Sequence, residues 1–239
     1  MLPILPFKMG NTEQSAIGKV GPYRTVQLSK IIDPATESRR CVLNRKHVEV
    51  NGVIDYHTDV DIVTHLGTHV EAPCHHGSLT KDVTDLPADH FMGRGVLLKL
   101  ETCEPCSLIT RADLEAADRG RVQSGDVLVL DSRFHSEPFV DNPDDRRPHL
   151  SRESAEWFLE KGVKAVGFGD GICIENNIEH CVACHDIMLG NDILFLEVMK
   201  NLDQLQAEIF FILYLPLPIK GLDACPVNII AIEGVPGFC

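Results

Sequence analysis

The segment from His65 to His75 reads HLGTHVEAPCH and brings three histidines and one glutamate together within eleven residues. Imidazole nitrogen and carboxylate oxygen are ligands that suit zinc, manganese or iron, so a divalent cation would account for this density of ligand-type side chains. A protein that supplies only three ligands leaves one coordination position open for water, as catalytic metal sites do. The segment therefore predicts a metal site that performs chemistry.

The spacing within this segment is that of a strand with a bend. His65, His69 and Glu71 share one parity, which places their side chains on one face of a strand. That parity begins upstream, in the series Asp59, Asp61, Val63, His65, Gly67, His69 and Glu71. A helix would turn His69 and Glu71 apart by roughly 200°, and a straight strand would hold His65 and His69 roughly 13 Å apart. We therefore expect the chain to curl at Gly67, because glycine adopts backbone angles that other residues avoid.

The same segment resembles the His-x-Gly-Thr-His-x-Asp-x-Pro-x-His signature of the cyclase family of metal hydrolases, which includes bacterial kynurenine formamidase and isatin hydrolase. Glu71 stands where this signature has aspartate. Two later segments also resemble the family and follow in its order. They are residues 185–205, which begin with HDIMLGNDILFLE, and residues 216–227, which read PLPIKGLDACPV.

The resemblance implies a specific set of ligands. His65, His69 and Glu71 would hold one metal ion, and in two-metal members Glu71, His185 and Glu197 would hold a second, with the carboxylate of Glu71 as the bridge. The implied cofactor is Zn or Mn. The longer side chain of Glu71 leaves open whether one or two ions bind, because ligand distances are fixed to within about 0.2 Å.

The resemblance also implies the reaction. His75 matches the catalytic histidine of the family, and a metal ion lowers the pKa of its bound water so that hydroxide attacks the carbon of an amide, lactam or lactone. His75 would take up a proton and return it to the leaving nitrogen or oxygen. The alternative is a metal-binding or ligand-binding member without chemistry. Glu71 supports that alternative, whereas the presence of His75 argues against it.

Two Cys-x-x-Cys pairs suggest other metal chemistry. Cys103 with Cys106, and Cys181 with Cys184, have the spacing of zinc knuckles, but the roughly 75 residues between the pairs exceed the usual separation. The second pair and His185 also form a haem attachment pattern, which competes with His185 as a hydrolase ligand. We expect reduced thiols, since the nine cysteines are odd in number and no export signal precedes them.

The elements that must position the site alternate between strands and helices, which predicts an α/β fold. Strands are expected at residues 95–100, 126–130, 163–168, 208–215 and 227–232, and helices after Thr110 and Ser151. The family resemblance narrows the expectation to the swivelling β/β/α fold with a central barrel-like sheet. Residues 1–239 are expected to form one domain, with residues 1–24 as an extension or arm.

Two loops stay ambiguous. Asp141 to Arg147 is rich in charge and proline, which indicates a solvated loop or a lid over the site. Gly167 to Gly171 lacks the helix that follows a nucleotide-binding glycine loop, and we expect a turn at a strand end that lines the pocket.

The overall composition limits the partners. A formal charge of −13 and a pI near 5.2 disfavour binding to nucleic acid or to an anionic membrane. The apolar runs near residues 2–7 and 209–219 are short and contain prolines, so we expect no membrane span and a cytoplasmic protein. We expect a small-molecule substrate, and the family resemblance implies a homodimer or homotetramer.

Overall fold

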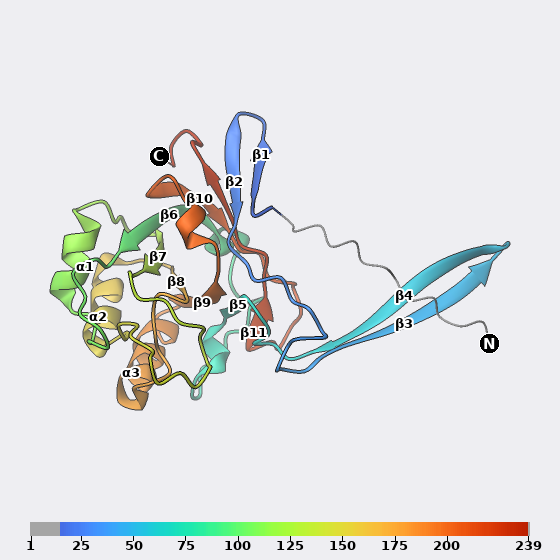
Figure 1. The fold of residues 1–239 in the computed structure, drawn as a ribbon, viewed down its shortest axis with the longest axis horizontal. Coiled ribbons are helices and arrows are strands. Elements are labelled where there is room, and N and C mark those ends of the chain that lie inside the picture. The colour runs from blue at the N-terminus through green and yellow to red at the C-terminus, as the bar shows by residue number, and fades with distance from the viewer. Residues whose placement is uncertain (1–14, 239) are drawn as a thin grey trace.

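The structure is a computed structural model that describes residues 15–238 (Figure 1). Within this range, ten strands form one mixed sheet in the order β1-β2-β12-β10-β6-β7-β8-β9-β5-β11. Their bounds are β1 Ile17–Val20, β2 Tyr23–Gln27, β5 His69–Glu71, β6 Met92–Lys99, β7 Val127–Asp131, β8 Ala165–Gly169, β9 Leu194–Met199, β10 Ile209–Leu213, β11 Ala224–Pro226 and β12 Ile230–Glu233. The five predicted strands correspond to β6, β7, β8, β10 and β12, with ends that differ by a few residues.

The centre of the sheet is parallel. Strands β6, β7, β8 and β9 pair in this order, and each connection between them contains one helix: α1 (Arg111–Asp118), α2 (Arg152–Lys161) and α3 (Ile178–Leu189). All three helices lie on the same side of the sheet (Figure 1). This arrangement confirms the predicted α/β class.

Alternation along the central strands divides the buried side chains into two cores. In β7, Leu128 and Leu130 pack toward the helices, and Val127 and Val129 pack on the opposite side, against strands from the two ends of the chain. The sheet also curves, because Ser29, just beyond β2, forms a bridge with Met199 at the end of β9. Strands that are distant in the sheet order therefore meet, as expected for a barrel-like arrangement.

The two helix caps predicted from sequence are present. The side chain of Thr110 accepts a hydrogen bond from the backbone of Asp113 at the start of α1, and Ser151 does the same with Ser154 at the start of α2. Gly162 ends α2 in the left-handed conformation. Among the described helices, none is long and apolar enough to cross a membrane.

A long hairpin departs from the body of the molecule (Figure 1). Its strands, β3 (Cys41–Val50) and β4 (Val53–Ile62), pair only with each other, and their residues are exposed except at Cys41. We call this hairpin the arm. It corrects the predicted continuous strand, because β4 ends at Ile62 and the pairing resumes only at His69. Asp59 and Asp61 consequently lie on the arm.

The chain before β2 forms one further strand at the edge of the sheet. The described part of the predicted N-terminal extension, residues 15–24, contains β1 and the start of β2, which pair with each other at the edge of the sheet. Residues 1–14 lie outside the described residues. Strand pairing joins residues 17–24 to the edge of the main sheet, and the single domain with an N-terminal extension or arm stays a prediction.

The two ambiguous loops turn out differently. Asp141 to Asp144 are exposed, but Arg147 is buried and pairs with Asp145 and Glu175, so the end of this loop is anchored. Gly167 to Gly171 form the end of β8 and a turn, as predicted. They do not line the site pocket, because Gly169 lies against the backbone of Met199, where a Cβ would approach its carbonyl oxygen to 2.1 Å.

Candidate metal centre

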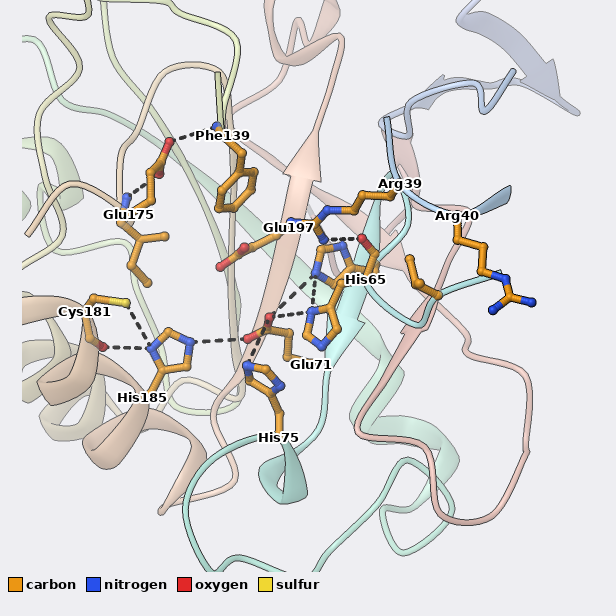
Figure 2. Close-up of a pocket in the computed structure, with 13 residues that line it drawn as sticks. Arg39, Arg40, His65, Glu71, His75, Phe139, Glu175, Cys181, His185 and Glu197 are labelled. Atoms are coloured by element: carbon orange, nitrogen blue, oxygen red, sulfur yellow. Dashed lines mark hydrogen bonds and ion pairs between the residues drawn. The ribbon is translucent and has the colours of Figure 1, made fainter. Parts of the chain in front are cut away.

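A pocket of about 630 Å³ opens between β5, β9 and α3 (Figure 2). All six residues predicted to act at the site line it: His65, His69, Glu71, His75, His185 and Glu197. They come from three separate segments of the chain: residues 65–75, α3 and β9. The sheet positions three of them, because His69 pairs with Glu197 across β5 and β9, and Glu71 lies two residues further along the same face. Val70 between them packs into the opposite core.

Gly67 produces the bend that the spacing requires. Its φ of +60° lies in the left-handed region, which favours glycine, and a Cβ there would lie 2.8 Å from Ile32 Cγ1. The bend brings His65 Nδ1 to within 3.1 Å of His69 Nε2. In a straight strand the Cα atoms of these two residues would lie roughly 13 Å apart. The prediction of a curl at Gly67 is confirmed.

Hydrogen bonds on the outer side of two rings fix which nitrogen carries a proton. His69 Nδ1 donates to the carbonyl oxygen of Gly67 at 2.9 Å, and His185 Nδ1 donates to that of Cys181 at 2.7 Å. The Nε2 atoms of both rings are therefore unprotonated in the neutral form and face the centre of the pocket. Histidines that bind metals are held in this way by a backbone or carboxylate oxygen.

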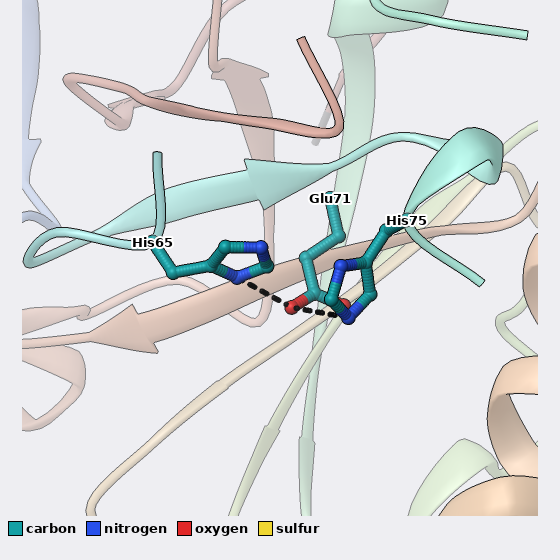
Figure 3. Close-up of side chains that lie close together, drawn as sticks. All are labelled: His65, Glu71 and His75. Atoms are coloured by element: carbon teal, nitrogen blue, oxygen red, sulfur yellow. Dashed lines mark ion pairs between the residues drawn. The ribbon is translucent and has the colours of Figure 1, made fainter. Parts of the chain in front are cut away.

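The carboxylate of Glu71 lies among the imidazole rings of the site (Figure 2), and Figure 3 shows it between His65 and His75. Its Oε1 atom is 3.0 Å from His65 Nδ1, 3.6 Å from His69 Nε2 and 3.8 Å from His75 Nε2. Its Oε2 atom is 3.5 Å from His185 Nε2 and has no hydrogen-bond partner among the described residues, although the side chain is buried. A buried oxygen without a partner is costly.

A metal cation fits this arrangement. His65 Nδ1 and His69 Nε2 face each other at 3.1 Å, and two ring nitrogens without protons repel at this distance unless a cation or proton lies between them. A divalent ion would also satisfy the unpartnered oxygen of Glu71. The donor set of imidazoles and carboxylates matches zinc or manganese in kind. The residues present therefore fit the metal that the sequence predicts.

The surroundings shift the pKa values of Glu197 and Glu71 in opposite directions. Burial, and then the neighbouring charge of Glu71, raises the pKa of Glu197 well above its ordinary value. Burial acts to raise the pKa of Glu71 too, but the facing imidazoles of His185, His65 and His69 outweigh it and lower that pKa far below its ordinary value. Metal binding would displace the protons shared by such groups, which is usual for sites of this kind.

Comparison with known proteins identifies the family. Residues 19–173, more than half of the chain, match the model of the Cyclase family. The chain belongs to the Cyclase family of metal-dependent hydrolases. The resemblance inferred from sequence is thereby confirmed.

Two similar curated relatives are kynurenine formamidases. The protein from Erythrobacter litoralis is 27% identical over 161 residues, which cover 67% of this chain and 69% of the relative. The protein from Bordetella petrii is 26% identical over 181 residues, covering 74% and 80%.

Solved structures show the same fold as this chain. Isatin hydrolase A from Ralstonia solanacearum superposes with a TM-score of 0.70 at 22% identity, covering 89% of this chain and 92% of that one. Isatin hydrolase A from Labrenzia aggregata, bound to benzyl benzoate, gives a TM-score of 0.71 at 20% identity, with coverage of 89% and 94%. The cyclase fold predicted from the resemblance is confirmed.

Which residues would bind which metal ion stays a prediction. Ligand atoms close enough to share an ion form two groups among the described residues: His65, Glu71 and His75 in one, and His69, Glu71 and Glu197 in the other. The sequence predicted a different division. Glu71 belongs to both groups, as the predicted bridge requires, and His75 is placed where it is either a base or a ligand.

The structure adds site residues that the sequence analysis did not single out. Arg39, Phe139 and Glu175 line the pocket, and Asp223 lies behind two of the histidines. Asp223 is within a segment that resembles the family, so its position carried a signal. Phe139 comes from a loop whose sequence shows no motif, and no local pattern could have found it.

The cysteine pairs do not form metal sites with each other. The eight described cysteines are free, and neither group of metal-binding candidates contains a cysteine. Cys184 is buried in α3 and donates to the carbonyl oxygen of Ser151, whereas His185 faces the pocket. Cys239 lies outside the described residues. The histidine of the haem attachment pattern is therefore engaged in the candidate metal centre.

Proposed function

We propose that this chain hydrolyses an amide, lactam or lactone of a small molecule, with Zn or Mn bound by its histidines and carboxylates. The observation that carries the proposal is the buried carboxylate of Glu71, whose oxygens face four imidazole rings. Relatives named kynurenine formamidase and isatin hydrolase support an enzyme that acts on amide bonds, similar to arylformamidases. One or two ions would bind, according to whether Glu71 bridges.

His65, His69, Glu71, His185 and Glu197 are the residues proposed to hold the metal. When bound, the metal supplies a Lewis acid that activates water and polarises the carbonyl of the substrate. His75 is the proposed general acid and base, since its side chain is 29% exposed and therefore accessible from the pocket. Its Nε2 atom takes a proton from the attacking water and returns it to the leaving nitrogen or oxygen.

The walls of the pocket favour a planar substrate. Val63, Phe139 and Ile174 supply apolar surface, and the guanidinium of Arg39 lies 5.3 Å from the centre of the Phe139 ring. Aromatic rings and guanidinium groups both stack on flat π systems. An aryl amide or a fused lactam matches this surface better than a flexible aliphatic amide does.

Hydrolysis of a defined panel tests the proposal. N-formyl arylamines, isatin-type lactams and enol lactones are each incubated with the protein, with and without added Zn or Mn. We expect metal-dependent turnover of at least one aryl amide or lactam. The alternative, a member that binds metal without chemistry, is supported by glutamate at the usual aspartate position. It predicts bound metal and no turnover of any member of the panel.

We further propose that the arm binds a second copy of this chain. Cross-strand partners on a hairpin share a face, so the register places Leu43 with Val60, and Ile54 and Tyr56 lie on that same face. All four side chains are about half exposed. The opposite face carries Asp55, Asp59 and Asp61 with Lys46, and also four exposed valines: Val42, Val48, Val50 and Val53. A two-stranded ribbon that leaves apolar side chains exposed is marginally stable alone in water.

The size of the arm fits an interface between two copies. Ten residues at about 3.4 Å each make a ribbon about 34 Å long, and one face of its two strands offers roughly 340 Å². In a twofold dimer each chain would bury this face of its own arm and an equal area that receives the partner's arm, which is roughly 700 Å² per chain. This is close to the about 800 Å² per partner of a standard interface. In a twofold dimer each arm would contribute once, so both apolar faces would be covered.

Substitution on the two faces of the arm tests this proposal. Leu43→Asp should weaken the dimer at least about 100-fold, since about 1.5 kcal/mol or more of burial is lost in each copy. The matched control is Val42→Asp, which introduces the same charge at a similarly exposed neighbour on the opposite face, where the aspartates lie. Sedimentation velocity measures the outcome. A monomeric wild-type protein, or equal effects of the two substitutions, would contradict the proposal.

A further inference from the structure

One carboxylate contacts two histidines of the site from behind. Asp223 Oδ2 is 3.1 Å from His65 Nε2 and 3.5 Å from His75 Nδ1. The two rings are adjacent, with centroids 4.5 Å apart. The opposite nitrogen of each ring, His65 Nδ1 and His75 Nε2, faces Glu71 Oε1. Both rings therefore lie between the carboxylates of Asp223 and Glu71.

The fold holds Asp223 in this place. It immediately precedes β11, which pairs with β5 so that Ala224 lies opposite Glu71. The carbonyl oxygen of Asp223 accepts a hydrogen bond of 2.8 Å from the backbone of Ala72. A residue distant in sequence is thus fixed by strand pairing beside the ligand segment. Asp223 belongs to neither group of candidate ligands, since it contacts the ring nitrogens that point away from Glu71.

We propose that Asp223 is the positioning residue that sets the protonation of both His65 and His75. With Glu71 and the Nδ1 atom of His65 engaged by a metal ion, the N–H of each ring is directed to Asp223, because an ionised carboxylate only accepts hydrogen bonds. His65 is then protonated on Nε2 and leaves Nδ1 free for metal, and His75 is protonated on Nδ1 and leaves Nε2 free to accept a proton. The inference rests on the proposed function only for its consequence in catalysis.

The consequence in catalysis follows from the charge of Asp223. When His75 accepts a proton at Nε2, the ring becomes a cation whose Nδ1–H already faces a carboxylate. A buried or half-buried carboxylate in this position orients the imidazole and stabilises the imidazolium, as in serine hydrolases. One aspartate would thus orient a metal ligand and the general base together.

The first test is the protonation state of the rings themselves. Long-range ¹H–¹⁵N spectra of zinc-loaded protein with ¹⁵N-labelled histidine report which nitrogen of each ring carries the proton. We expect the proton of His75 on Nδ1 and that of His65 on Nε2 in the wild-type protein. These spectra are recorded on the wild-type protein and do not depend on hydrolytic activity. Protons found on His75 Nε2 and His65 Nδ1 would overturn the inference, whether or not the protein is a hydrolase.

The second test is Asp223→Asn, compared with Asp186→Asn. Asp186 is a matched control, because it pairs at 2.9 Å with Nε2 of His76, a neighbouring histidine without an assigned role. With saturating Zn, Asp223→Asn should lower kcat about 10- to 100-fold with KM unchanged, and should alter the ¹⁵N signals of His75. Asp186→Asn should change neither. Equal losses in the two variants, or unchanged His75 signals and kcat in Asp223→Asn, would contradict the role of Asp223.

Discussion

His69→Ala is expected to lose bound metal and hydrolytic activity together, with a fall in kcat/KM of at least about 10³-fold. The His69 side chain is buried, and its Nε2 atom lies 3.6 Å from Glu71 Oε1 and 3.1 Å from His65 Nδ1. Its removal takes away one of the nitrogens proposed to hold the metal. Metal ions contribute several kcal/mol to reactions of this type, and each 1.36 kcal/mol corresponds to tenfold in rate.

Elemental analysis and a hydrolysis assay on the same preparation measure this outcome. His135→Ala is the control, because this histidine is 48% exposed and does not line the pocket. It should retain both metal and activity. A His69→Ala protein that keeps its full metal content and its rate would remove His69 from the site.

His75→Ala is expected to keep its metal while its rate falls about 10²- to 10⁴-fold, which is the usual contribution of a general base. His75 follows β5 in the short turn at Pro73–His75, and its Nε2 atom is 3.8 Å from Glu71 Oε1, further than the corresponding atom of His65. Its greater exposure, 29% compared with 21% for His65 and 3% for His69, favours a proton-transfer role over a ligand role.

Metal content separates the two roles of His75, because the structure also places it in a group with His65 and Glu71 that could share an ion. If His75 is a ligand, its removal should lower metal content as His69→Ala does. His76→Ala provides the comparison, since this adjacent histidine pairs with Asp186 outside the two candidate groups. Equal loss of metal in His69→Ala and His75→Ala would show that His75 is not the base.

The parts of the fold that local chemistry specifies were predictable from sequence. Thr110 and Ser151 begin helices because their side chains satisfy backbone N–H groups within one turn. Gly67 marks a bend because its neighbours must be on one face and close together, and only glycine accommodates the backbone angle easily. The ligand segment is compact, so its residue types and spacing carried most of the site.

The parts that depend on distant segments were not predictable from local patterns. Asp223 reaches His65 only because β11 pairs with β5, a contact between residues 158 apart in sequence. The arm was missed because alternation along β4 continues into the parity of the ligand segment, although the pairing stops at Ile62. Helix α3 contains a run of cysteine and histidine that suggested metal motifs rather than a helix.

The measurement that tests the account most directly is the joint titration of metal content and hydrolysis rate. Protein stripped with a chelator is reloaded with increasing Zn or Mn, and bound metal per chain and the rate on an aryl amide are followed together. We expect no activity without metal and full activity at about one or two ions per chain, with Glu197→Gln reducing two to one if Glu71 bridges. A protein that binds no transition metal, or that hydrolyses the substrate equally well without it, would contradict the account.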